Sequence, residues 1–147
     1  MISLLDVNVL VALAWPNHVH HEAAHRWFRR ARSQGWATCP LTQTGFVRVS
    51  SNERVLPDAR PPAEVLAVLE KITDVPGHVF WSDDISLCAS EFVSRKRLVG
   101  YRQVVDAHLL ALALSRGGLL ATFDRGVLEI VPEAVPPGDA VFVIQAT

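Results

Sequence analysis

Residues 1–14 read MISLLDVNVLVALA, and this stretch decides the fold. The run Ile2–Leu5 is short and apolar without alternation, which predicts a strand that is buried on both faces. Asp6 follows directly, and residues 8–14 predict a short helix that Pro16 stops. The chain therefore opens with a buried strand, a carboxylate at the end of that strand, and a helix immediately afterwards.

The same alternation continues along the rest of the chain. Further strands are predicted at residues 36–39, 79–81, 119–122 and 140–144, and further helices at residues 20–32, 42–51, 63–73, 86–96 and 104–116. Thr42 is the predicted N-cap of its helix. Strands that alternate with helices predict an α/β fold, with a mainly parallel central sheet flanked by helices. The length of 147 residues fits a single domain over residues 1–147.

The composition is that of a folded protein, because half of the residues are hydrophobic and a fifth are charged. The formal net charge is −1, so a polyanion must be met by a local basic patch. No apolar run reaches the roughly 20 residues that span a bilayer, and no basic residue precedes the apolar N-terminal stretch. We therefore expect a cytoplasmic protein without a membrane anchor, whose Cys39 and Cys88 are reduced thiols in the core.

Three aspartates occupy positions at which carboxylates can meet. Asp6 and Asp124 each follow a predicted strand, and the carboxyl ends of parallel strands share one edge of the sheet. Asp106 lies in the first turn of the most apolar helix. Three converging carboxylates repel one another unless a cation neutralises them, and oxygen ligands select Mg²⁺ or Mn²⁺ over Zn²⁺. The pattern predicts a metal site that activates water, with Asn8 and Thr122 orienting carboxylates or waters.

Four motifs occur in the order and spacing of one known family. They are Leu4-Leu-Asp-Val-Asn-Val-Leu-Val-Ala-Leu13, Thr44-Gly-Phe-Val-Arg-Val49, Arg102-Gln-Val-Val-Asp-Ala-His-Leu-Leu-Ala-Leu-Ala113 and Ala121-Thr-Phe-Asp124. Together they resemble the PIN-domain ribonucleases, and in particular the VapC-type toxins of bacterial type II toxin–antitoxin pairs. The resemblance covers nearly the whole chain.

This resemblance implies an Mg²⁺-dependent endoribonuclease with a PIN-like fold. By similarity, Asp6, Asp106 and Asp124 are the catalytic acids of the metal site. The family implies a homodimer that a cognate antitoxin holds inactive, and structured RNA, often transfer RNA, as the substrate. Arg102 is the basic residue that we expect near the scissile phosphate, because it lies four residues before Asp106.

The sequence departs from the family pattern at Gln43, where the family commonly has Glu. A Gln side chain offers a carbonyl oxygen, but it carries no charge and cannot act as a base. The site would then hold three negative charges instead of four. We expect weaker metal binding or a single-metal mechanism, with Gln43 in a supporting role.

Other functions fit parts of the pattern. His21-Glu-x-x-His25 matches the zinc-hydrolase motif, and Gln43 makes a non-catalytic PIN-like RNA-binding module a second alternative. A structure-specific DNA nuclease is the third. Each aspartate alone could also be a helix cap or a turn residue.

Basic and aromatic residues give weaker signals. The basic segments 29–32 and 95–97 fit either solvated helix ends or phosphate contacts. Trp15, beside Pro16, is the aromatic residue that we expect at a dimer or antitoxin contact.

Overall fold

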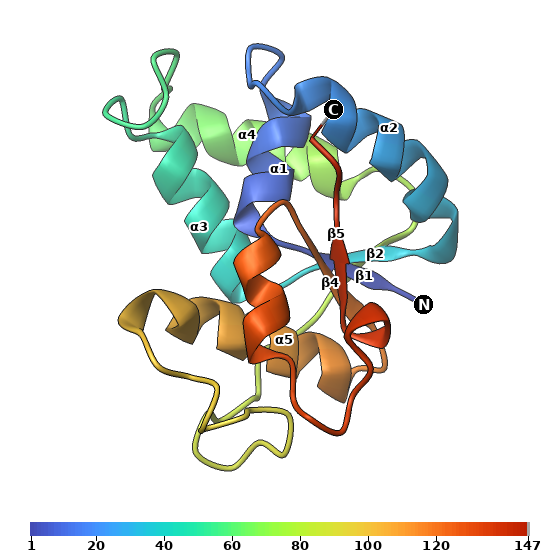
Figure 1. Cartoon of the computed structure of the whole chain (residues 1–147). Coiled ribbons are helices and arrows are strands. Elements are labelled where there is room, and N and C mark those ends of the chain that lie inside the picture. The colour runs from blue at the N-terminus through green and yellow to red at the C-terminus, as the bar shows by residue number, and fades with distance from the viewer. Residues whose placement is uncertain (147) are drawn as a thin grey trace.

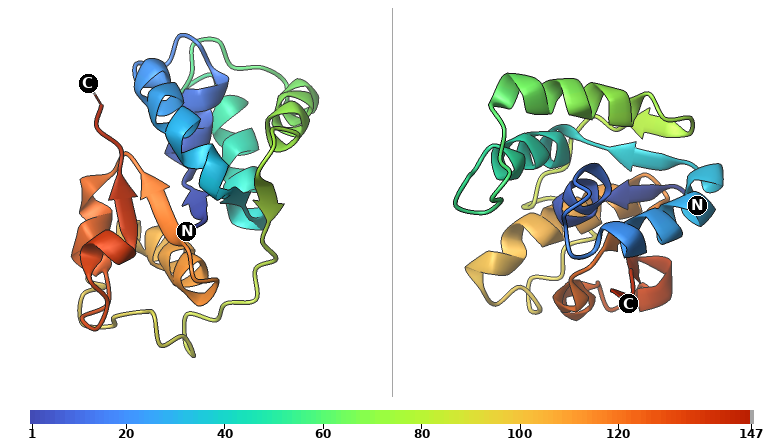
Figure 2. Two further views of the ribbon diagram at one scale, coloured as in Figure 1. Left: turned by 90° about the vertical axis from the view of Figure 1, so that its right-hand side faces the viewer. Right: turned by 90° about the horizontal axis from the view of Figure 1, so that it is seen from above.

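A computed structural model describes residues 1–146 and confirms the predicted fold class. Its five strands form one sheet in the order β3-β2-β1-β4-β5, and every neighbouring pair is parallel. The strands are β1 Ser3–Leu5, β2 Trp36–Thr38, β3 His78–Phe80, β4 Leu119–Thr122 and β5 Val141–Val143. The α-helices are α1 Val7–Ala14, α2 His21–Ala31, α3 Pro40–Ser50, α4 Pro62–Thr73 and α5 Val104–Ser115. Figures 1 and 2 show the helices around this sheet.

The first strand is buried on both faces, as its lack of alternation predicts. Leu4 belongs to a core cluster that includes the apolar residues of α5, whereas Leu5 belongs to a second cluster with residues of α1, α2, α3 and α4. Both leucines are fully buried. Successive side chains of a strand point to opposite faces, so the run Leu4–Leu5 connects two hydrophobic cores.

Helix α3 forms despite Gly45 because it packs tightly against α1. A Cβ atom at Gly45 would lie 2.6 Å from a methyl group of Val7, which is too close for any side chain. The helix begins at Pro40 with Cys39 as its N-cap residue. Thr42 is therefore not the N-cap that the sequence predicts. It lies inside the first turn, where its hydroxyl accepts the Cys39 N–H at 3.0 Å.

The predicted helix at residues 86–96 is wrong, because residues 81–100 form turns and irregular structure. The hydroxyls of Ser86 and Ser90 accept the backbone N–H groups of Cys88 and Phe92, at 3.2 and 3.1 Å. Such local bonds offer the backbone an alternative to helical hydrogen bonds. As a result Cys88 is an exposed thiol, and only Cys39 occupies the core.

Within residues 1–146, none of the helices combines the length and the apolar character needed to cross a membrane.

Candidate active site

Asp6 is a buried carboxylate at the junction of β1 and α1. As the N-cap of α1, it accepts the Val7 N–H at 2.8 Å through Oδ1. Its other oxygen, Oδ2, accepts the Thr122 hydroxyl at 2.7 Å and the Asn8 side-chain amide at 3.4 Å. Asp6 is thus a helix cap, but its second oxygen faces a polar group from the neighbouring strand.

Thr122 connects the two aspartates that follow β1 and β4. The strands pair Leu5 with Ala121, which places Asp6 and Thr122 level at the carboxyl edge of the sheet. While the Thr122 hydroxyl donates to Asp6, its oxygen accepts the Asn8 amide at 3.2 Å and the Asp124 N–H at 3.0 Å. A hydroxyl has one donor and two acceptor sites, so Thr122 is fully satisfied. The predicted supporting residues Asn8 and Thr122 therefore both contact Asp6.

Asp106 and Asp124 line the same pocket as Asp6. This cavity of about 550 Å³ also contains Asn8, and its walls include apolar residues of α1, α3 and the loop after α3. Asp124 accepts the Gly126 N–H at 2.8 Å through Oδ1, as the cap of the short 3₁₀ helix Arg125–Ile130. Asp106 lies in the first turn of α5, and no hydrogen bond joins its carboxylate to another described residue. The structure thus brings together the three aspartates that the sequence predicts.

The shared pocket raises the pKa values of two of these carboxyl groups. Burial raises the pKa of Asp106 to about 6, and the nearby charges of Asp6 and Asp124 add to the shift. Burial also raises the pKa of Asp6, against the hydrogen bonds from Thr122 and Val7, and repulsion from Asp124 adds to it. None of the described residues that line the pocket is Lys or Arg, so the negative charge has no internal partner.

These oxygen donors and their uncompensated charge fit a hard divalent cation. However, within residues 1–146 no three acidic, histidine or cysteine side chains lie close enough together to hold one ion jointly. The pocket of about 550 Å³ has room for water among the carboxylates. The arrangement therefore fits an ion held partly through water better than one held by three direct carboxylate bonds.

Gln43 and Arg102 lie outside the residues that line this pocket. The Gln43 side-chain amide donates to the Thr38 hydroxyl at 3.0 Å, at the end of β2. Arg102 is exposed just before α5, with its guanidinium 5.6 Å from the centre of the Tyr101 ring and its Nε donating to the Tyr101 hydroxyl. The structure offers no contact between either side chain and the three aspartates.

His18 lines the acidic pocket, although the sequence does not predict it as a site residue. Its Nδ1 accepts the His20 backbone N–H at 3.0 Å, which fixes the ring. Burial lowers the pKa of His18, and the nearby His20 and His21 lower it further. The neutral ring then carries its proton on Nε2 and can donate a hydrogen bond. The sequence does not show that a histidine in a loop lines a pocket, because its neighbours are set only when the chain folds.

The zinc-hydrolase interpretation of His21 and His25 is not supported. His21 Nδ1 lies 2.7 Å from the Ala12 carbonyl oxygen, and His25 Nε2 lies 2.9 Å from that of Leu13. The two rings therefore bond to carbonyls at the end of α1. No third ligand joins them among the described residues. Their i, i+4 spacing lets both histidines of α2 contact the end of α1.

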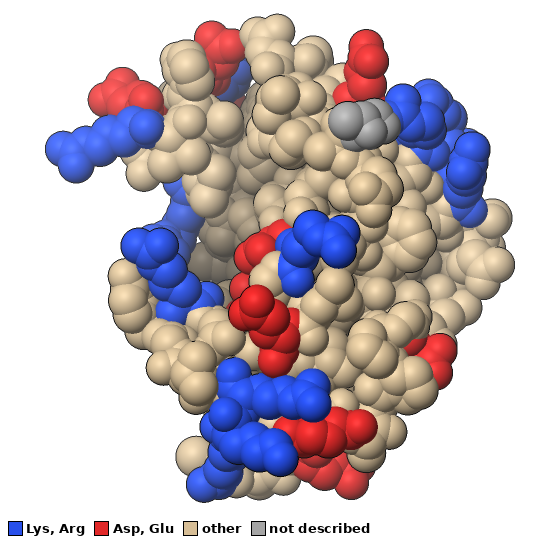
Figure 3. Space-filling model, in the orientation of Figure 1, with Lys and Arg blue, Asp and Glu red and all other residues tan. Residues whose placement is uncertain are grey.

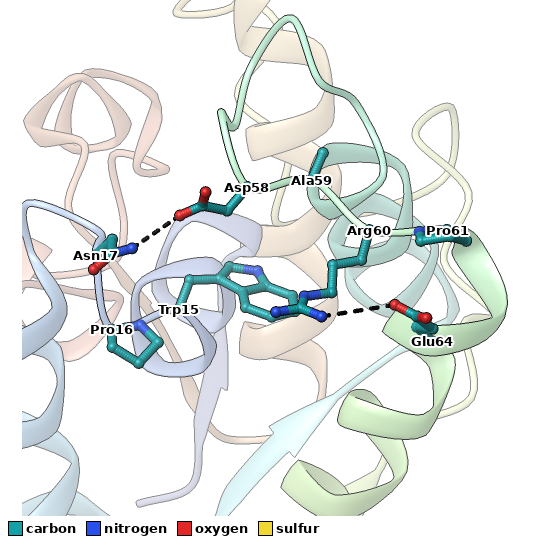
Figure 4. A pocket seen from close by; sticks show the side chains of 8 residues that line it. All are labelled: Trp15, Pro16, Asn17, Asp58, Ala59, Arg60, Pro61 and Glu64. Atoms are coloured by element: carbon teal, nitrogen blue, oxygen red, sulfur yellow. Dashed lines mark hydrogen bonds and ion pairs between the residues drawn. The ribbon is translucent and has the colours of Figure 1, made fainter.

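Trp15 lies at a second cavity, of about 580 Å³, beside Arg60 and Glu64 of the α3–α4 connection and α4 (Figure 4). Its indole Nε1 donates to the Ser50 hydroxyl at 2.8 Å, and its ring stacks parallel to Phe46. The indole is thus fixed and partly exposed. Contact between Trp15 and a partner protein stays a prediction.

The face seen in Figure 3 is hollowed, with acidic atoms at the edge of the hollow and basic side chains on both sides. A two-sided arrangement of this kind lets phosphates approach carboxylates that would repel them on their own.

Comparison with known proteins identifies the family. The model of the PIN domain family matches residues 3–132. The chain is 49% identical to Ribonuclease VapC39 of Mycobacterium tuberculosis over 129 residues, which cover 88% of this chain and 93% of the relative. It is 51% identical to Ribonuclease VapC38 of the same organism over 131 residues, or 89% and 91% of the two chains. For Ribonuclease VapC44, the identity is 44% over 135 residues, or 91% and 94%. The chain therefore belongs to the PIN-domain family, among its VapC-type members.

Proposed function

We propose that this protein is an Mg²⁺-dependent endoribonuclease that hydrolyses phosphodiester bonds in structured RNA, with transfer RNA as a substrate. The observation that carries the proposal is the shared pocket of Asp6, Asp106 and Asp124, whose described lining residues include no Lys or Arg. The relatives named as ribonucleases give independent support. The zinc alternative lacks a third ligand among the described residues.

Asp6, Asp106 and Asp124 would hold the Mg²⁺ ion, in part through water, and Mn²⁺ would be a substitute. When bound, the ion lowers the pKa of a water molecule and offsets charge on the phosphate. Thr122 and Asn8 hold Asp6 in one orientation by hydrogen bonds at 2.7 and 3.4 Å, so the carboxylate is positioned before any ligand arrives. His18 offers an N–H donor at the wall of the pocket for a phosphate or ribose oxygen.

The same proposal includes the cellular setting that the family implies. The protein would be a cytoplasmic toxin and a homodimer, and a cognate antitoxin would inhibit it. Apolar side chains beside the acidic pocket fit protein contacts of this kind, because Val55 and Val105 are 55% and 51% exposed and line one groove between α3 and α5.

Cleavage of transfer RNA by the purified protein tests the proposal. We expect cleavage with Mg²⁺, none with EDTA, and recovery when Mg²⁺ is restored. Asp124→Asn should abolish cleavage, whereas Asp74→Asn is the matched control, because Asp74 is an exposed residue at the end of α4. A flap DNA substrate is assayed in parallel.

Several results would contradict the proposal. Cleavage that survives EDTA would exclude the metal, and cleavage of DNA alone would indicate a DNA nuclease. RNA binding without any cleavage by the wild-type chain would indicate a binding module, the alternative that Gln43 raises.

A further inference from the structure

A groove between α2 and β5 has features of a nucleic-acid contact that the acidic pocket lacks. This α2–β5 groove measures about 520 Å³. It is lined by Ala23, Arg26, Trp27, Arg30, Ala31, Phe142, Ile144 and Gln145. The lining residues of α2 recur at intervals of three and four, so they form one face of that helix. They are separate from the residues that line the acidic pocket.

The arginines of this groove are exposed and have no acidic partner. Within residues 1–146, the guanidinium groups of Arg26 and Arg30 form no ion pair and no hydrogen bond. Arg29 lies on the adjoining face beside Arg26 and His25. Interaction with the helix dipole explains basic residues in the last turn, where Arg29 and Arg30 lie, but it does not explain Arg26 in the middle of α2.

The second basic segment of the sequence, residues 95–97, is used inside the fold. Lys96 and Arg97 lie 4.0 and 3.2 Å from the carboxylate of Glu133, and Arg97 also donates to the Val131 carbonyl. Arg95 donates to the Cys88 carbonyl at 3.0 Å. The charges of Lys96 and Arg97 are therefore paired within the fold, and Arg95 is hydrogen-bonded there. Of the two predicted basic segments, only the α2 segment keeps its charges free within the described chain.

Aromatic rings form part of the same groove. Trp27 and Phe142 stack with ring centroids 6.1 Å apart and an angle of 29° between their planes. Phe142 is 46% exposed, although it is a large apolar residue on a strand. Trp27 is partly buried, so Phe142 is the exposed ring of the pair. An aromatic pair that is exposed in part, beside free arginines, is a surface on which unpaired bases can stack while their phosphates bind guanidinium groups.

We propose that the α2–β5 groove is a second contact site for the RNA substrate, with phosphates on Arg26 and Arg30 and an unpaired base on the Trp27–Phe142 pair. The inference rests on the proposed function. It also answers an electrostatic problem, because the net charge is −1 and three carboxylates line the proposed catalytic pocket. Neither feature attracts a polyanion by itself, so RNA affinity requires basic groups outside the pocket lining.

Equilibrium binding at several salt concentrations tests this inference. Fluorescein-labelled transfer RNA is titrated with the full-length protein carrying Asp124→Asn, which prevents cleavage, at 50–200 mM KCl. In this background we compare Arg26→Gln/Arg30→Gln with the matched pair Arg95→Gln/Lys96→Gln. Loss of two phosphate contacts should reduce the slope of log K against log salt by about 1.4, whereas the matched pair should leave it unchanged.

Phe142→Thr separates stacking from charge. This variant replaces the ring with a β-branched side chain that suits a strand, and it should weaken RNA binding about tenfold without changing the salt slope. Unaltered affinity and slope in all groove variants would overturn the inference. Unaltered RNA binding together with lost binding of the antitoxin would also overturn it, because the groove would then be a protein interface. Failure of the proposed function appears separately, as absence of cleavage by the wild-type protein with Mg²⁺.

Discussion

Two polar clusters lie at the same edge of the sheet, and they differ in charge. At the ends of β1 and β4, Thr122 joins the carboxylate of Asp6 to Asn8 and Asp124. At the end of β2, Thr38 occupies the corresponding place, and its partner His78 is the first residue of β3. Its hydroxyl oxygen lies 3.0 Å from the Gln43 amide and 2.7 Å from His78 Nε2.

This second cluster is neutral, and its side chains form hydrogen bonds with one another. Burial lowers the pKa of His78, and Gln43 carries no charge, so the network has no charge that a cation would offset. The first cluster retains carboxylates, and none of the described residues that line their pocket is Lys or Arg. A position at the carboxyl edge of a parallel sheet is thus insufficient for a metal site. Acidic residues must also converge there.

Asp6→Asn removes the central charge of the first cluster, and we expect the largest effect from it. RNA cleavage should fall by at least about 100-fold, because the negative charge is lost while the size and shape of the side chain are kept. Circular dichroism should show a folded protein. Cleavage within a few-fold of the wild-type rate would place the chemistry elsewhere.

Thr122→Val and Thr38→Val make the same change in the two clusters. Both threonines are fully buried. Thr122→Val should reduce cleavage about 10–100-fold, because Asp6 loses the hydroxyl that orients it. Thr38→Val should leave the cleavage rate within a few-fold.

Both substitutions should lower the free energy of unfolding by about 1–3 kcal/mol, since each leaves buried polar groups unsatisfied. Cleavage rates are therefore compared at a temperature where both variants are folded. Equal losses of activity would mean that the two clusters do not differ in function.

Asp106→Asn tests the charge repulsion through pH. The pKa of Asp106 is raised from 3.8 to about 6, so the folded protein keeps this proton longer than the unfolded chain does. Wild-type stability should therefore fall as pH rises from about 4 to about 6. Asp106→Asn lacks this loss, and without metal its Tm at pH 7 should exceed that of the wild type by about 2–4 °C, the shift produced by roughly 1 kcal/mol.

The difference in Tm should vanish at pH values below 4, where both side chains are neutral. Calorimetry at pH 3.5, 5 and 7 measures it. A constant difference at all three pH values would indicate a packing effect of the substitution and not relief of charge repulsion.

Gln43→Glu introduces a carboxylate into the neutral cluster, and we expect the smallest effect on activity. Gln43 contacts Thr38 and lies outside the residues that line the acidic pocket. Cleavage should change less than about threefold, because the side chain at position 43 contacts Thr38 and none of the residues that line the pocket. A tenfold gain in Mg²⁺ affinity would instead show that position 43 takes part in the metal site.

The sequence predicts the sheet and the three aspartates because these features depend on local patterns. Short apolar runs give the strands, and Asp6 and Asp124 follow two of them at positions that a parallel sheet brings together. Asp106 is conspicuous because it interrupts an apolar helix. The acidic pocket follows from topology without knowledge of side-chain contacts.

Other features depend on contacts between residues far apart in the chain. His18 joins the pocket only because its loop folds against the end of β4, where His20 stacks on Phe123. The turns at residues 81–100 depend on serine hydroxyls that accept backbone N–H groups in place of helical hydrogen bonds. The Gln43 side chain, in turn, is directed by its hydrogen bond to Thr38. The i, i+4 spacing of His21 and His25 cannot reveal that one ring nitrogen of each histidine contacts a carbonyl oxygen of α1.

Binding of Mn²⁺ is the most direct test of the central claim, that three distant aspartates form one cation site. Electron paramagnetic resonance measures free Mn²⁺ as it is added to the wild-type protein, to Asp106→Asn and to the control Asp74→Asn. We predict one class of sites that is weakened at least about tenfold by Asp106→Asn and unchanged in the control. Equal Mn²⁺ binding by all three proteins, or none by the wild type, would contradict the account.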